Sequence, residues 1–396
     1  MRELGSMRFL MMTGAYKNDE LVRCVCGTES QERETALGSY ARVCEILMSH
    51  DLSLSEYIFR LAVDGLGEVY EQYEATESEL LFSNIRRDIE SLAEFAKISS
   101  KELSASLRER FPVSDDVGFP VYKCGQKEIT AESVFEFRKS FGNWFYAENK
   151  AFIFEKGELK PIKKYDTVRL SGLKRYETQR QAVVENTLAF IKGSRYSNAL
   201  LYGDRGTGKS STIKAVVNEY SELRIVLVPK SELCALYDLY GKLEKIPLKF
   251  VLFMDDMIFS GDEPEYTFLK QALEGSVCVM PENCVIYAAT NRQHIVRENV
   301  SEFEDGSNSA DVRDEKASLA DRFGLYVTFY APDKNTYLDI VKQIVSDRNI
   351  DIPENDLSRL AERFAVRKGS RSPRTAAQFA DKLEARLALG LDPEKI

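Results

Sequence analysis

The most constraining feature of this sequence is an unbroken P-loop, the pattern G-x-x-x-x-G-K-S. It comprises Gly203, Asp204, Arg205, Gly206, Thr207, Gly208, Lys209 and Ser210, with Ser211 directly after it. An apolar run at 199–202 predicts a strand before the loop, and residues 212–220 predict a helix after it. In that context, backbone N–H groups and the helix N-terminus bind a phosphate chain. Lys209 reaches the β- and γ-phosphates, and the Ser210 hydroxyl binds Mg²⁺. We therefore expect the chain to bind a nucleoside triphosphate.

The composition is that of an ordinary soluble protein. Its 396 residues are 44% hydrophobic and 30% charged, and the net charge is −9. This balance disfavours a protein that binds nucleic acid over its whole surface but leaves room for a local basic patch. No apolar run approaches the ~18 residues that span a bilayer, so we expect no membrane contact. Seven scattered cysteines and only two histidines indicate reduced thiols rather than disulfides or a zinc site, and reduced thiols predict a cytoplasmic location.

The first part of the chain reads as helical. Ile85, Ile89 and Leu92 fall on one helical face, and residues 53–56, Ser-Leu-Ser-Glu, predict a capping box that opens another helix. No catalytic constellation occurs in this part. We interpret it as an accessory domain that offers a surface to a protein partner.

The periodicity changes near residues 145–165. We expect three domains: a mainly helical accessory domain at 1–150 with a small hairpin at its end, an α/β nucleotide-binding core at 151–332, and a C-terminal helical domain at 333–396.

Strands and helices alternate within the expected core. Strands are predicted at 199–202, 224–228, 250–254, 285–289 and 325–329, and helices at 179–190, 212–220, 231–245 and 266–274. Such alternation implies an α/β fold, a parallel sheet with crossover helices.

Two adjacent carboxylates follow an apolar strand. Asp255 and Asp256 end the run 250–254. Carboxylates at the carboxyl end of a buried parallel strand lie in the crevice where ligands bind. Asp255 would hold Mg²⁺, and Asp256 would be the base that polarises the attacking water. The alternative, two aspartates in a strand-ending turn, is disfavoured by the P-loop upstream.

Three polar side chains follow later elements. Asn291 comes just after the strand at 285–289, and its amide can bridge the attacking water and the γ-phosphate. Arg322 lies in the sequence Ala-Asp-Arg-Phe-Gly before the last strand, and Arg374 follows Ser-Pro at the start of a C-terminal helix.

Together, the order of these motifs resembles the AAA+ ATPases. The resemblance implies ATP as the cofactor, an oligomer of identical subunits, and a C-terminal helical lid. It implies Walker A at Lys209 and Ser210, Walker B at Asp255 and Asp256, sensor 1 at Asn291, an arginine finger at Arg322 and sensor 2 at Arg374.

Among AAA+ proteins, the sequence most resembles a bacterial family known by a domain-of-unknown-function label. Shared signatures occur at residues 185–187, at the P-loop, at the Asp-Asp pair, at 290–292 and at the finger segment. The finger segment is also similar to that of replication initiators, and the sequence Ser-Pro-Arg at 372–374 to that of branch-migration motors. The resemblance covers roughly residues 145–390.

One residue departs from the AAA+ pattern, and two further assignments concern sensor 2 and the adenine pocket. The base position is Asp256 rather than glutamate, one methylene shorter, which predicts slow turnover. Both Arg371 and Arg374 are candidates for sensor 2, with Arg374 favoured because it starts a helix. The segment 172–176, which ends at Tyr176, is expected to wall the adenine pocket.

We therefore expect an oligomeric ATPase that hydrolyses ATP to ADP and phosphate to remodel or switch a macromolecular partner. Two alternatives share this fold. One is a DNA-associated loader or initiator-like ATPase, and the other is an ATP-binding switch with negligible turnover.

Overall fold

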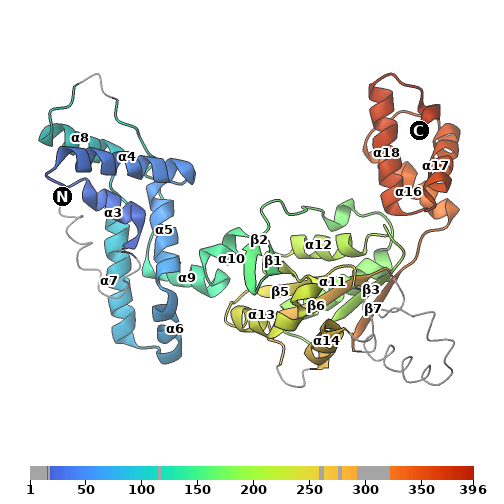
Figure 1. Cartoon of the computed structure of the whole chain (residues 1–396), viewed down its shortest axis with the longest axis horizontal. Coiled ribbons are helices and arrows are strands. Elements are labelled where there is room, and N and C mark those ends of the chain that lie inside the picture. Colours follow the sequence, from blue (N-terminus) through green and yellow to red (C-terminus); the bar gives the residue numbers. More distant parts are fainter. Residues whose placement is uncertain (1–15, 17, 115–117, 258–262, 275–278, 292–321) are drawn as a thin grey trace. The chain divides into compact units, whose positions relative to one another are not determined.

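The computed structural model describes residues 16, 18–114, 118–257, 263–274, 279–291 and 322–396 (Figure 1). The chain forms two compact units, Met1–Glu148 and Asn149–Ile396. Within the described residues, no helix combines the length and the apolar character needed to cross a membrane.

Helices packed around a single core make up the first unit. Among the residues that the structure describes, they include α3 (Glu20–Gly27), α4 (Arg33–Ser49), α5 (Leu54–Gly65), α6 (Gly67–Thr76), α7 (Glu79–Phe95), α8 (Ser100–Arg110), α9 (Ala131–Phe141) and α10 (Trp144–Glu148). The predicted capping box opens α5: the Ser53 hydroxyl accepts the Glu56 N–H, and the Glu56 carboxylate accepts the Ser53 N–H. Ile85, Ile89 and Leu92 are fully buried, which confirms the predicted apolar stripe.

A seven-stranded sheet is the centre of the second unit. Its strands are β1 (Ala151–Glu155), β2 (Glu158–Pro161), β3 (Ala199–Gly203), β4 (Leu223–Leu227), β5 (Lys249–Met254), β6 (Cys284–Thr290) and β7 (Leu325–Phe329). Their order in space is β2-β1-β4-β5-β6-β3-β7. Every neighbouring pair except β1–β2 is parallel, which confirms the predicted α/β fold.

The hairpin predicted near residue 152 belongs to this sheet rather than to the helical unit. β1 pairs in parallel with β4, with Ala151 opposite Ile225. The two turn residues, Lys156 and Gly157, both have positive φ, 55° and 74°. Positive φ at both central positions marks the turn that matches the twist of a two-residue hairpin.

Helices cover both faces of the sheet. α11 (Glu177–Ile191) and α12 (Lys209–Glu219) pack on one face, and α13 (Leu236–Leu243) and α14 (Pro264–Glu274) lie on the other (Figure 1). Strands β3 and β6 are buried along their whole length, as expected for a sheet covered on both sides. The helix predicted at 231–245 is shorter, because its first part forms the 3₁₀ segment η3 (Lys230–Ala235).

A three-helix bundle follows the sheet. It consists of α16 (Lys334–Asp347), α17 (Glu354–Lys368), α18 (Pro373–Ala388) and the short 3₁₀ segment η5 (Pro393–Lys395). Asp333 caps α16 and Ser372 caps α18, each accepting a backbone N–H three residues on, and Gly369 ends α17 at φ 66°. The bundle has its own core, which includes Tyr337 and Phe379. We call residues 333–396 the lid.

The packing at Gly203 generates a stability prediction. Gly203 has φ 136°, and a Cβ there would lie 2.1 Å from the carbonyl oxygen of Phe329. We expect Gly203→Ala to destabilise the second unit by about 2 kcal/mol or more, because backbone blocks the added methyl. In Gly241→Ala, the matched helical control, the methyl meets nothing within 4 Å. The control should gain about 0.5–1 kcal/mol. Hydrogen exchange of β3 peptides in rising denaturant measures the stability of the second unit in both variants. Equal protection in the two variants would contradict the prediction.

Candidate active site

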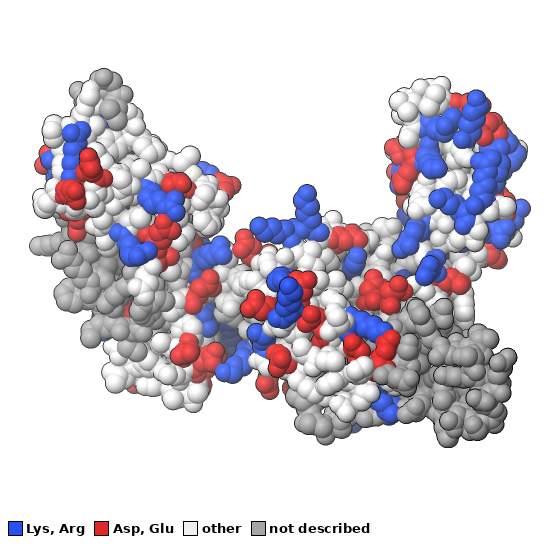
Figure 2. Space-filling view, viewed as in Figure 1, with Lys and Arg blue, Asp and Glu red and all other residues white. Residues whose placement is uncertain are grey.

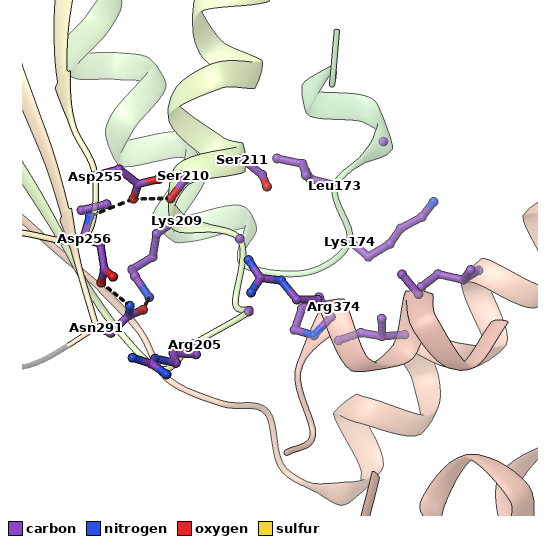
Figure 3. Close-up of a pocket in the computed structure, with 18 of the residues that line it drawn as sticks. Leu173, Lys174, Arg205, Lys209, Ser210, Ser211, Asp255, Asp256, Asn291 and Arg374 are labelled. Carbon is purple, nitrogen blue, oxygen red and sulfur yellow. Dashed lines mark hydrogen bonds between the residues drawn. The ribbon is translucent and has the colours of Figure 1, made fainter. Parts of the chain in front are cut away.

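Three loops meet at one edge of the sheet. The P-loop follows β3, Asp255 and Asp256 follow β5, and Asn291 follows β6, which lies between these two strands. Since the three strands run parallel, their carboxyl ends share this edge. A cavity of about 830 Å³ opens there, within the usual size range of small-molecule sites. Figure 3 shows the P-loop, the two carboxylates and Arg374 around it.

Lys209, the first residue of α12, lies at the inner end of the cavity. Its side chain is almost buried, with 6% of the residue exposed. Nζ donates to the carbonyl oxygens of Gly203 and Asp204, both at 2.8 Å, and to Oδ1 of Asn291 at 3.1 Å. Burial lowers the pKa of the ammonium group, while neighbouring aspartates act in the opposite direction. The cation is thus held by three acceptors where the motif puts the β- and γ-phosphates.

Asn291 joins Lys209 to Asp256. Its Nδ2 donates to Oδ1 of Asp256 at 2.6 Å, while its Oδ1 accepts from Lys209 (Figure 3). Only this orientation of the amide serves both neighbours, because an ammonium group cannot accept and a carboxylate cannot donate. Asp256 itself has φ 53°, a left-handed conformation that aspartate tolerates better than most residues.

Ser210 and Asp255 provide two oxygens side by side. The Ser210 hydroxyl donates to Oδ1 of Asp255 at 2.8 Å, and the same oxygen accepts the N–H of Asp256 at 3.1 Å. Hydroxyl and carboxylate oxygens are the ligands that Mg²⁺ prefers, and Mg²⁺ sites usually use few protein groups. The pair therefore fits the predicted metal site. Among the described residues, no cluster of three or more His, Cys, Asp and Glu forms an alternative.

The lid closes one side of the cavity through the start of α18. The Arg374 N–H donates to the carbonyl oxygen of Gly206 at 3.2 Å. Gly206 has φ 77°, and a Cβ there would meet the Ser372 hydroxyl at 2.7 Å. The Arg374 side chain lines the cavity and is close enough to Lys209 to contribute to its lowered pKa.

Arg371 is engaged elsewhere. Its guanidinium forms two hydrogen bonds to the Glu362 carboxylate, at 2.5 and 3.3 Å, within the lid. It lines a second cavity, next to the first, and not the one that contains Lys209. Of these two arginines, Arg374 is therefore the one that lines the cavity together with Lys209.

Apolar side chains also contribute to the lining of the main cavity. Leu173 from the segment before α11 and Ile340 and Ile344 from α16 line it. An ion pair between Lys174 and Asp347 (2.5 Å) joins the two sides. Residues 172–174 of the segment predicted to wall the adenine pocket therefore line the cavity.

Tyr176 lies beside the cavity rather than in its lining. Its hydroxyl donates to the carbonyl oxygen of Tyr330 at 2.6 Å, and its ring packs 5.3 Å from that of Phe329. Burial raises its pKa to about 12. Arg175 and Tyr176 both have positive φ, 60° and 61°, so the chain bends sharply before α11.

Comparison with known families gives one match. The sequence profile of the family described as "Protein of unknown function (DUF815)" matches residues 147–387. The chain belongs to the DUF815 family. No curated protein sequence matched the chain.

Several solved structures resemble the chain at low sequence identity. A mutant of RuvB from Thermotoga maritima has 17% identity and a TM-score of 0.40, with 56% of this chain and 66% of that one covered. Another T. maritima RuvB structure, titled a Holliday junction branch migration motor, has 16% identity and a TM-score of 0.40, covering 57% and 67%. AMPPCP-bound DnaA from Aquifex aeolicus has 17% identity and a TM-score of 0.39, with the same coverage. The chain spans about two thirds of the length of these proteins.

In this DUF815 chain, the signature around residue 186 has a structural role. The Asn186 side chain donates to the Ser197 carbonyl oxygen and accepts the Ser197 N–H, both just before β3. The buried Thr187 hydroxyl contacts the hydroxyl of Tyr287 on β6 at 2.8 Å. These bonds fix the entry of the P-loop strand β3 beside β6, the strand that Asn291 follows.

A contact that the sequence did not reveal joins the P-loop to the lid connection. Oδ2 of Asp204 accepts the N–H of Ala331 at 2.6 Å, and the Asp204 N–H donates to Phe329. The two partners of the side-chain bond are 127 positions apart, so no local pattern could indicate it.

Arg322 lies at the amino ends of the strands, opposite to the carboxyl ends where the cavity opens. It precedes β7, which runs parallel to β3 with Leu325 opposite Ala199. The amino ends of these strands face away from the P-loop, and Arg322 does not line the cavity. The adjoining residues 319–321 and Arg292 of the predicted motifs lie outside the described residues.

The lowered pKa of Lys209 predicts pH-dependent phosphate binding. A phosphate ligand favours the charged ammonium, so binding should take up a proton wherever the pKa below 10.5 leaves Lys209 partly neutral. ATP affinity should therefore fall as the pH rises toward 10.5. Calorimetry in two buffers of different ionisation enthalpy measures the proton uptake. Lys209→Arg, which stays charged, should lose the pH dependence, and proton release by the parent would contradict the assignment.

Proposed function

We propose that this protein is an ATPase that hydrolyses ATP to ADP and phosphate, slowly and as an oligomer. The observation that supports this most is the hydrogen-bonded series Lys209–Asn291–Asp256. It links the lysine of the P-loop to a carboxylate next to the position where a γ-phosphate would bind. The enzyme would use this turnover to remodel or switch a macromolecular partner.

In the proposed reaction, a water oxygen bonds to the γ-phosphorus, and the bond to the bridging oxygen breaks. ADP leaves with the electron pair. Asp256 accepts the proton of the water, and Asn291 orients both the carboxylate and the water. Lys209 and Arg374 would neutralise the phosphate charge, as charge-assisted donors do.

Mg²⁺ would be held by Ser210 and Asp255 and would neutralise charge on the phosphates. Slow turnover follows from the aspartate at position 256. Its carboxylate lies one methylene nearer the backbone than that of a glutamate, and it already accepts a hydrogen bond from Asn291.

Arg322 is proposed as the arginine finger of a neighbouring subunit. Within its own subunit it lies beyond the amino ends of β3 and β7, a strand's length from the P-loop. It therefore could contribute to catalysis only across an interface. The alternative, a cation that suits the dipole at the end of a helix, needs no oligomer.

The charge distribution favours a protein partner for the first unit. Residues 1–148 contain 17 Lys and Arg and 26 Asp and Glu, which accounts for the whole net charge of −9; the rest contains 37 of each. Such a unit suits a partner with a basic face and disfavours nucleic acid.

On the face that Figure 2 shows, Lys and Arg side chains are more prominent on the lid than on the first unit. On α17, however, Arg359 and Arg363 pair with Glu394, and Arg367 donates to the carbonyl oxygen of Ile396. This pairing weakens the case for the DNA-associated alternative. ATP turnover measured with and without duplex DNA separates the three functions, since a switch would bind ATP without turnover.

Two substitutions at the phosphate end test the proposal by separating binding from turnover. Lys209→Ala should abolish ATP binding, because it removes the charge-assisted contacts to the phosphates. Asp256→Asn should bind ATP normally but lose about 100-fold or more in rate, because the amide cannot take the proton. Equilibrium binding of ATP and phosphate release measure the two effects. If Lys209→Ala binds and hydrolyses ATP as the parent does, the P-loop assignment is wrong; if only Asp256→Asn is unchanged, Glu263 and Glu265 are tested next as the base.

A mixing experiment tests the trans role of Arg322. Arg322→Ala and Lys209→Ala subunits should each be inactive, with a loss on the order of 10³ or more for the finger variant. Mixed together, they should regain part of the activity, because some interfaces combine an intact P-loop with an intact finger. Absence of recovery in a mixture shown to co-assemble, or a strictly monomeric protein with ATP, would overturn this role.

A further inference from the structure

The outer turn of the P-loop is held on two sides. At its start, Gly203 touches the Phe329 backbone, and at Gly206 the loop touches the first turn of α18. Only Asp204 and Arg205 lie between these two contacts. The Asp204 carboxylate already accepts the N–H of Ala331. Arg205 is therefore the one side chain of this turn left to face the cavity.

Arg205 lies at the phosphate end of the site. The Nζ of Lys209, which marks that end, donates to the carbonyl oxygen of Asp204, the residue directly before Arg205. Arg205 and Asn291 both line the main cavity and the second cavity beside it. Figure 3 shows Arg205 next to Asn291, with Arg374 on the other side of the loop.

Within the described residues, no ion pair or hydrogen bond holds the Arg205 guanidinium. Arg371, which shares the second cavity, is in contrast paired with Glu362. Arg205 is exposed and lines the same cavity as Lys209, Asp255 and Asp256. A guanidinium carries five N–H donors, from which the oxygens of a phosphate can accept hydrogen bonds. Its planar fork matches the oxygens of a phosphoryl group better than any other side chain.

We propose that Arg205 is a catalytic residue that contacts the γ-phosphate bound in its own subunit. Its charge stabilises the oxygens of the phosphoryl group as the bond to ADP breaks, which adds a cis arginine to any finger from a neighbour. This inference deepens the proposed ATPase function and rests on it. A charge that acts mainly in the transition state raises kcat more than it tightens ATP binding.

Arg205→Ala is the direct test, with Arg195→Ala as the matched control. Arg195 is an exposed arginine before the amino end of β3, at the opposite edge of the sheet. Under single-turnover conditions, Arg205→Ala should lose about 10²-fold or more in rate, as for other single groups that stabilise transition-state charge. Its ATP Kd should change by no more than about threefold. Arg205→Lys should recover part of the loss, since it keeps the charge without the fork.

A second measurement reports the transition state without turnover. ADP with aluminium fluoride mimics the transferring phosphoryl group, so Arg205→Ala should weaken its binding far more than that of ATPγS. Equal weakening of both ligands would mean that Arg205 only binds the ground state, and the inference would be wrong.

A mixture of Arg205→Ala and Lys209→Ala subunits tests whether Arg205 acts in its own subunit. Lys209→Ala subunits retain Arg205, but they should not restore Arg205→Ala subunits, because each arginine serves its own P-loop. Restoration would assign Arg205 to the neighbour's site and overturn the cis role.

The failure of this inference is distinct from that of the ATPase proposal. If the parent hydrolyses ATP and the Arg205→Ala variant does so at the same rate, only the inference about Arg205 is wrong. A parent that shows no turnover would remove both.

Discussion

The site depends on the close approach of Gly203 to the carbonyl oxygen of Phe329. Because no side chain fits between them, the end of β3 and the end of β7 meet backbone to backbone. The chain leaves β7 at this point and continues into the lid. The Asp204 bond to Ala331 and the Arg374 bond to Gly206 then hold the lid connection and the first turn of α18 against the same loop. The P-loop is thus a junction between sheet and lid as well as a phosphate-binding turn.

Much of the second unit was predictable because its signals are local. A run of buried residues such as 250–254 forms a strand, and the polar residue after each parallel strand reaches the same edge of the sheet. The P-loop, the Asp255–Asp256 pair and Asn291 could therefore be assigned to one site from their order alone. The distances among them agree, from Lys209 to Asn291 and on to Asp256.

The remaining parts depend on pairings between distant residues. The sequence left Arg371 as a second candidate for sensor 2 beside the favoured Arg374, because no local pattern indicates that Arg371 pairs with Glu362 within the lid. Nor did it reveal that β1 joins the sheet, since its partner β4 is about seventy residues further on. Tyr176 illustrates the same limit: it belongs to the expected segment, but its hydroxyl bonds to Tyr330 rather than facing the cavity. Such contacts reflect tertiary packing, which overrides local pattern.

The uneven charge of the two units has a consequence for assembly. If subunits associate through the neutral second unit, each one adds a first unit of net charge −9 to the same particle. Repulsion between these units opposes association and is screened over about 8 Å at physiological ionic strength. Salt would therefore promote assembly rather than weaken it. A cationic partner bound to the first unit would have the same effect, and by linkage the assembled form would bind that partner more tightly than the free subunit.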